Sequence, residues 1–155
     1  MIIALQGVGS IGKTTTLKIL LRKISDLATI NKCGLNNPVY RKDNHLRKAE
    51  YLTDLLQAKG TDVYAVFIWN GKRIGITTQG DEAKYLKAAF KKLEVCDIYV
   101  CAARSRGGTI KFLTEKDKNC IFLSKTKSSS AETQLFLNQG DAQKIFELLR
   151  SATEH

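Results

Sequence analysis

The residues best suited to chemistry lie near the start of the chain, where three glycines precede a lysine and a threonine. Segment Gly7–Thr14 fits the pattern G-x-x-x-x-G-K-[ST] at every defined position. Glycines let a backbone wrap tightly, so that successive N–H groups point at phosphate oxygens. Lys13 would place a cation on the β- and γ-phosphates, and the Thr14 hydroxyl would ligate Mg²⁺. The alternative is a plain glycine-rich turn.

The flanking residues supply the elements that must position this motif. Residues 2–6 form a short apolar run that predicts a buried strand. From Lys13 to Ala28, apolar residues recur at helical spacing. A helix that begins at Lys13 would add the positive end of its dipole to a bound phosphate. Strand, loop and helix therefore occur in the order that phosphate binding requires.

On these residues the chain resembles the P-loop NTPase superfamily, and the sharp resemblance covers residues 1–28. It implies a nucleoside triphosphate with Mg²⁺ as ligands. ATP is the default, because guanine-specific relatives carry N-K-x-D where Cys101–Arg104 stands here. The residues expected at the phosphates are Gly7, Gly9, Ser10, Ile11, Gly12, Lys13, Thr14 and Thr15.

The resemblance also implies an acidic residue at the end of an apolar strand, which would hold Mg²⁺ through water. Ligands bind at the carboxyl ends of parallel strands, so Asp97, which begins its strand, is rejected. Asp81 follows the strand Arg73–Thr78 and is the first choice for the metal, with a helix N-cap as its alternative role. Asp62 is second, because a hairpin that pairs Val63 with Thr78 would return it to the same edge.

The remaining elements predict an α/β fold, a three-layer sandwich whose mostly parallel sheet includes one antiparallel hairpin. The hairpin comprises strands 63–69 and 72–78 around Asn70-Gly71, a strong signal for a type I′ turn. Residues 31–38 are expected to form a loop, residues 133–138 a short strand, and Asp141 the cap of the last helix. The other predicted elements are helices 43–58 and 81–94 and strands 97–102 and 120–123. We expect one domain over residues 1–155.

Twenty-five basic and fifteen acidic residues give a net charge of +10, which favours a polyanionic partner. Half of this excess falls in residues 104–127, which hold seven basic and two acidic residues. Arg104 and Arg106 follow a strand and could grip phosphates or offset transition-state charge. A solvated basic loop is the alternative. The run Lys125–Lys127 follows the next strand, where proteins of this superfamily often contact the base.

Composition excludes other classes of protein. A hydrophobic content of 43% argues against disorder, and no apolar run approaches the roughly 20 residues that span a bilayer. The four cysteines lack the paired spacing of a structural zinc site, and together with the absence of a signal peptide they favour a cytoplasmic protein. Tyr51, Tyr64, Phe67 and Trp69 are expected to pack in the core rather than to stack on bases, with Trp69 the most exposed.

Three functions remain in competition. The first is a small phosphotransferase that uses Mg·ATP and an anionic acceptor, such as a phosphorylated small molecule, near Arg104 and Arg106. Lys13, Asp81 and these two arginines would then be catalytic. The second is an ATPase module that works with nucleic acid or a protein partner, which the charge favours. The third is a non-catalytic, GTPase-like switch, although Thr77 stands where that pattern needs aspartate.

Overall fold

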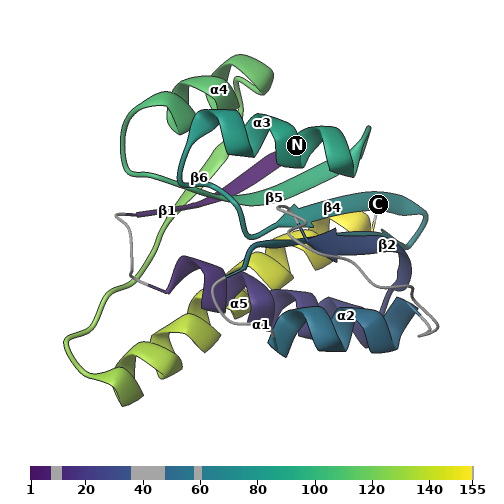
Figure 1. Cartoon of the computed structure of the whole chain (residues 1–155), viewed down its shortest axis with the longest axis horizontal. Coiled ribbons are helices and arrows are strands. Elements are labelled where there is room, and N and C mark those ends of the chain that lie inside the picture. Colours follow the sequence, from purple (N-terminus) through teal and green to yellow (C-terminus); the bar gives the residue numbers. More distant parts are fainter. Residues whose placement is uncertain (8–11, 36–47, 58–60, 155) are drawn as a thin grey trace.

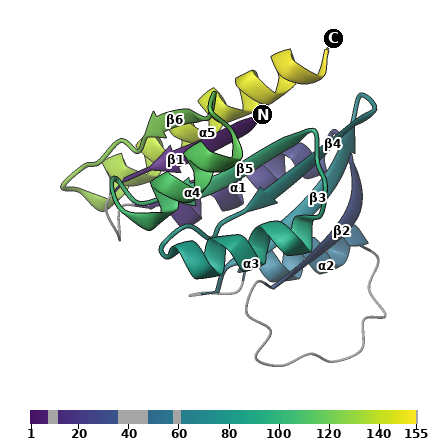
Figure 2. The ribbon, with the colours of Figure 1, turned by 90° about the horizontal axis from the view of Figure 1, so that it is seen from above.

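The computed structural model describes residues 1–7, 12–35, 48–57 and 61–154. These residues form five helices and one six-stranded mixed sheet, with strand order β2-β3-β4-β5-β1-β6. Helices α1, α2 and α5 cover one face of the sheet, and α3 and α4 cover the other (Figures 1 and 2). The α/β class predicted from the sequence is confirmed. In chain order the elements are β1 (Ile2–Gln6), α1 (Lys13–Ser25), β2 (Thr29–Leu35), α2 (Lys48–Gln57), β3 (Val63–Trp69), β4 (Lys72–Thr77), α3 (Ala83–Leu93), β5 (Ile98–Ala103), α4 (Gly108–Lys116), β6 (Ile121–Ser124) and α5 (Ala131–Thr153).

Strand direction gathers several chain segments at one edge of the sheet. β1 runs parallel to both of its neighbours, β5 and β6, and β4 runs parallel to β5. β3 pairs antiparallel with β2 and with β4. The carboxyl ends of β1, β4, β5 and β6 therefore share the edge at the left of Figure 1, together with the start of β3. We call this the carboxyl edge.

The β3–β4 hairpin has the predicted register. Trp69 pairs with Lys72 and Tyr64 with Thr77, and the Thr78 N–H donates to the Val63 carbonyl at 3.0 Å. The turn residues Asn70 and Gly71 have φ angles of 50° and 77°, which is the positive range that a type I′ turn needs. A two-residue turn at Asn70-Gly71 therefore sets which residues of the hairpin reach the carboxyl edge.

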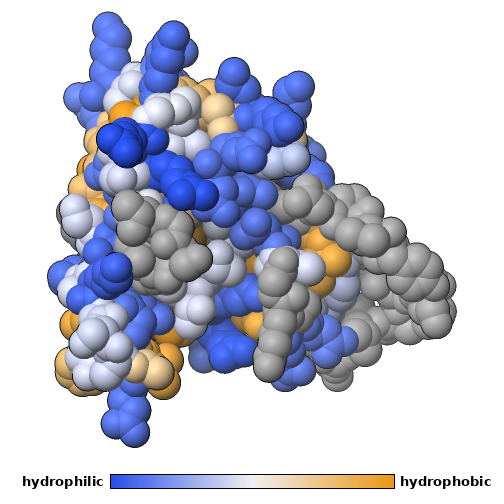
Figure 3. Space-filling view, turned by 60° about the vertical axis from the view of Figure 1, so that its left-hand side comes forward, coloured by the Kyte–Doolittle hydropathy of each residue, from blue (hydrophilic) through white to orange (hydrophobic). Residues whose placement is uncertain are grey.

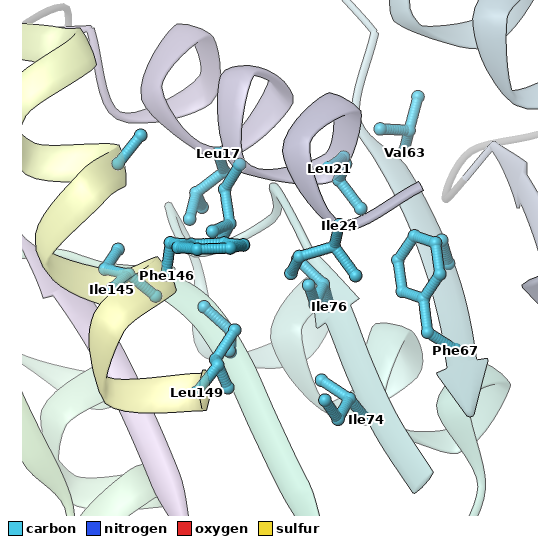
Figure 4. Close-up of a cluster of buried hydrophobic side chains, with 14 of the residues drawn as sticks. Leu17, Leu21, Ile24, Val63, Phe67, Ile74, Ile76, Ile145, Phe146 and Leu149 are labelled. Carbon is cyan, nitrogen blue, oxygen red and sulfur yellow. The ribbon is translucent and has the colours of Figure 1, made fainter. Parts of the chain in front are cut away.

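The core lies on both faces of the sheet. On one face, Leu17, Leu21 and Ile24 of α1 pack with apolar residues of β3, β4 and α5 (Figure 4). On the other, side chains of α3 and α4, such as Leu86 and Leu113, cover Ile2 and Ala4 of β1. Because β1 is covered on both faces, it reads in the sequence as a continuous apolar run instead of alternating.

Two predictions for the last third of the chain are wrong. Residues 133–138 are helical, because α5 begins at Ala131 with Ser130 as its N-cap, whose hydroxyl accepts from the Thr133 N–H. Asp141 is therefore a buried residue in the middle of α5 and caps nothing. The run Leu135–Leu137 suggested a strand, but Leu135 and Phe136 are exposed in the helix.

Other predicted elements also differ from the structure. Residues 31–35, expected as a loop, belong to β2, and helix α4 was not predicted. Trp69 is buried rather than exposed, and its ring centroid lies 5.5 Å from that of Phe146. Residues 43–47 of the predicted second helix and Pro38 lie outside the described residues. In the part of the chain that is described, no helix has both the length and the apolar content to cross a membrane.

Candidate functional site

The glycine motif, residues Gly7–Thr14, begins where two neighbouring parallel strands send the chain to opposite faces of the sheet. β1 leads to α1 on one face, and β5 leads to α4 on the other. Such a divergence opens a crevice at the carboxyl ends of the two strands, where ligands of open α/β sheets bind. The Gly7 N–H continues the strand pairing by donating to the Ala103 carbonyl at 3.0 Å. The motif therefore leaves the sheet at this crevice.

Lys13 is held at the crevice by backbone oxygens of both strands. Its Nζ lies 2.6 Å from the Gly7 carbonyl oxygen and 3.1 Å from that of Ala103. Burial lowers the pKa of Lys13. The charge of Asp81 acts to raise this pKa, and the charge of Arg104 acts to lower it. The side chain is only 6% exposed. The partners of this buried ammonium group are carbonyl oxygens, so it brings positive charge to the crevice.

The first turn of α1 has features that favour an anion. Its N-cap residue, Gly12, has a φ angle of 85° and makes no side-chain capping hydrogen bond. The turn contains no acidic residue, and the first backbone N–H groups of any helix lack partners within it. A Cβ atom on Gly12 would also lie 2.8 Å from Oδ1 of the buried Asn138 in α5. Both the backbone angle and this contact require glycine here.

Asp81 lies where the sequence places it, on the turn that follows β4. The Gln79 side chain organises the turn, since its Oε1 accepts from the N–H groups of Gly80 and Asp81. Gly80 packs directly on β5, where an added Cβ would fall 2.0 Å from the Ala102 carbonyl oxygen. Helix α3 begins at Ala83 with Glu82 as its cap residue. The alternative role of Asp81 as the N-cap is therefore wrong.

Two neighbouring cavities lie beside these residues. The smaller, of about 250 Å³, is lined by Gly12, Lys13, Thr14, Thr15 and Asp81. The larger, of about 670 Å³, shares Thr14, Thr15 and Asp81 with it and extends along α1. We call this larger cavity the α1 cleft. Figure 3 shows the carboxyl edge, where most of the described surface is hydrophilic.

Asp62 also reaches the carboxyl edge, as the hairpin register predicts. It lines the α1 cleft, and its Oδ1 accepts a hydrogen bond from the Thr78 hydroxyl at 2.7 Å. The same hydroxyl accepts from the Val63 N–H. Asp97 lies at the opposite edge, where its carboxylate accepts from the Arg73 N–H. Asp81 and Asp62 therefore lie at the carboxyl edge, as predicted, and Asp97 does not.

Of the two predicted arginines, Arg104 contacts the candidate site. Its Nε lies 3.5 Å from Oδ1 of Asp81. Arg106 is exposed on the next turn of the loop. Lys116, another basic residue of segment 104–127, lies away from the site, over the rings of Phe90 and Tyr99. Tyr99 is near the start of β5, at the opposite edge.

The Lys125–Lys127 segment serves an internal role that the sequence did not reveal. Lys125 Nζ lies 2.9 Å from Oδ2 of Asp141, and both side chains are buried. Thr126 donates to the same carboxylate through its N–H and its hydroxyl. Burial alone would raise the pKa of Asp141, but the hydrogen bonds from Lys125 and Thr126 outweigh it and lower the pKa. This cluster ties the end of β6 to the middle of α5.

The residues present fit Mg²⁺ bound with a triphosphate. Magnesium prefers oxygen ligands and is commonly bound through one or two carboxylates plus phosphates and water. Thr14 and Asp81 offer a hydroxyl and a carboxylate to the same cavity. Among the described residues, no group of three or more His, Cys, Asp or Glu side chains could hold a metal alone. Any Mg²⁺ here would depend on its phosphate ligand.

Sequence reasoning missed four residues around the site. Gln79 accepts hydrogen bonds in the Asp81 turn, and Asn138 lies beside Gly12. No pattern in the sequence marks either residue. Lys18 and Arg22 line the α1 cleft, and their i, i+4 spacing after Thr14 was a signal that could have been used. Three residues expected at the phosphates, Gly9, Ser10 and Ile11, lie outside the described residues.

Comparison with known proteins gives no family for this chain. No family profile, curated protein or solved structure matches it significantly.

Proposed function

We propose that this protein binds Mg·ATP at the glycine motif and transfers a phosphoryl group to an anionic acceptor. The observation that carries the proposal is the position of Lys13. Its ammonium group is held between the carbonyl oxygens of Gly7 and Ala103, at the crevice between β1 and β5, beside a helix N-terminus whose cap residue is glycine. Phosphate binding uses these same components.

Each residue has a defined task in this proposal. Lys13 and the first N–H groups of α1 bind the β- and γ-phosphates, while Thr14 and Asp81 hold Mg²⁺. The ion supplies charge neutralisation on the phosphate oxygens. Arg104, adjacent to Asp81, stabilises charge on the transferring group, with Arg106 on the same loop as an auxiliary cation.

A thermal-shift titration of the wild type and Lys13→Ala tests the nucleotide site. At 100 times its Kd, a ligand stabilises the folded state by about 2.7 kcal/mol. For a domain of this size that corresponds to a rise in Tm of roughly 5–10 °C. We expect Mg·ATP to raise the Tm of the wild type and of Lys91→Ala, which alters an exposed lysine of α3, but not of Lys13→Ala. An equal shift in all three would refute the phosphate-binding role of Lys13.

A second measurement addresses the reaction. ATP turnover is measured alone and with a panel of phosphorylated metabolites and nucleoside monophosphates. Turnover that requires an acceptor and yields its phosphorylated form supports the phosphotransferase. Turnover that instead rises with nucleic acid, in a salt-dependent manner, supports the ATPase module.

A further inference from the structure

The α1 cleft contains charges that the proposed nucleotide site does not use. It begins at Thr14, Thr15 and Asp81 and continues along α1 past Lys18 to Arg22. Its volume of about 670 Å³ is suited to a small molecule. It shares these three lining residues with the smaller cavity. A molecule in the cleft would therefore lie next to the transferable phosphate.

We propose that the α1 cleft binds the phosphoryl acceptor, and that this acceptor is a phosphomonoester whose phosphate lies between Lys18 and Arg22. This inference rests on the proposed function and names the acceptor class. The two cations are four residues apart, so they lie on one face of α1 with Cβ atoms roughly 5–6 Å apart. One dianionic phosphate can contact both, and the arginine fork can engage two of its oxygens.

The length of the cleft limits the size of the acceptor. Lys18 and Arg22 follow Thr14 by four and eight residues, which at about 1.5 Å per residue places them roughly 6 and 12 Å along the helix axis. The group that accepts the phosphoryl group must lie near Thr14. It is therefore separated from the acceptor's own phosphate, between Lys18 and Arg22, by about 6–12 Å. Sugar phosphates and nucleoside monophosphates fit this range, whereas inorganic phosphate does not span it.

The walls of the cleft suit such a molecule. Ile19 and Leu56 supply an apolar surface for the middle of a sugar or base. Asp62, fixed by the Thr78 hydroxyl, offers a carboxylate that can accept a hydrogen bond from an acceptor hydroxyl. Thr61 also lines this region.

Lys18 is partly buried, and both Asp62 and Arg22 are charged neighbours of it. Burial lowers the pKa of Lys18, Asp62 raises it and Arg22 lowers it further. A phosphate between Lys18 and Arg22 would relieve their mutual repulsion.

Calorimetric titration tests the proposal with the full chain saturated by Mg²⁺ and a non-hydrolysable ATP analogue. The probes are glucose 6-phosphate, the nucleoside 5′-monophosphates and, as neutral controls, glucose and the nucleosides. We expect at least one phosphorylated probe to bind, and its Kd to rise at least tenfold in Lys18→Gln and in Arg22→Gln. Lys91→Gln, which removes the same charge from an exposed site on α3, should leave that Kd within twofold.

The outcomes separate this inference from the proposed function. If the analogue binds but no phosphorylated probe does, or if Lys18→Gln and Arg22→Gln bind the probe as tightly as Lys91→Gln, the acceptor site is wrong and the nucleotide site stands. If the analogue itself does not bind the wild type, the proposed function fails. Unchanged analogue affinity in both cleft variants, within twofold, shows that these variants remain folded.

Discussion

Replacing Gly80 by alanine should disrupt the turn that carries Asp81. The new Cβ would lie 2.0 Å from the Ala102 carbonyl oxygen, whereas real Cβ contacts essentially never fall below 3.0 Å. The turn must therefore move away from β5 by at least 1 Å. That movement breaks the Ala102 N–H bond to the Gln79 carbonyl, which is already 3.3 Å long, and displaces Asp81 from Thr14 and Thr15.

The expected cost follows from these contacts. Overpacking of a core contact costs about 1–3 kcal/mol, and a lost hydrogen bond costs about 1 kcal/mol. We therefore expect Gly80→Ala to lower the free energy of unfolding by about 2–4 kcal/mol in urea denaturation. At a temperature where the variant is still folded, it should also weaken the Mg²⁺ dependence of nucleotide binding.

Gly140 provides the matched control for this substitution. It lies inside α5, and an added Cβ meets nothing within 4 Å. Alanine has a better helix propensity than glycine, so Gly140→Ala should raise the free energy of unfolding by about 0.5–1 kcal/mol. A loss below 1 kcal/mol in Gly80→Ala would refute the close packing of the Asp81 turn on β5.

Other predictions concern the buried residues behind the site. Asp141→Asn leaves the Lys125 ammonium group buried without its carboxylate and should cost about 3–5 kcal/mol in urea denaturation; a loss below 1 kcal/mol would contradict a buried pair. Because the pKa of Asp141 is lowered in the folded state, its stabilisation is present above the ordinary value of about 3.9 and is lost as the pH falls below it. The stability difference between wild type and Asp141→Asn should therefore shrink below about pH 4, and a constant difference would be inconsistent with this ionisation. Gly12→Ala should cost about 1–2 kcal/mol from its positive φ alone, and more from the Asn138 contact. In the double variant Gly12→Ala/Asn138→Ala, the cost of the Asn138 contact should disappear, whereas the cost of the positive φ should remain. A double-mutant cycle measures the difference.

Patterns among neighbouring residues were enough to predict β1 and α1. The apolar run of residues 2–6 predicted the strand, the helical spacing after Lys13 predicted the helix, and both elements are confirmed. The Asn70-Gly71 turn set the hairpin register, and with it the position of Asp62, because a two-residue turn leaves one way to pair the strands. The candidate nucleotide residues were likewise predicted from one motif, and their function stays a prediction.

Tertiary structure decided what the local signals could not. Helix α5 begins ten residues before Asp141, with Ser130 as its N-cap, and Asn138 in its first half lies beside Gly12. The sequence placed Lys125 where proteins of the resembled superfamily often contact the base, but its side chain is buried and paired with Asp141 of α5. The α1 cleft depends on α1, α2 and the start of β3 meeting at one edge. Spacing within the chain specifies which residues share a helix face, whereas the packing of distant elements decides which of those faces enclose a site.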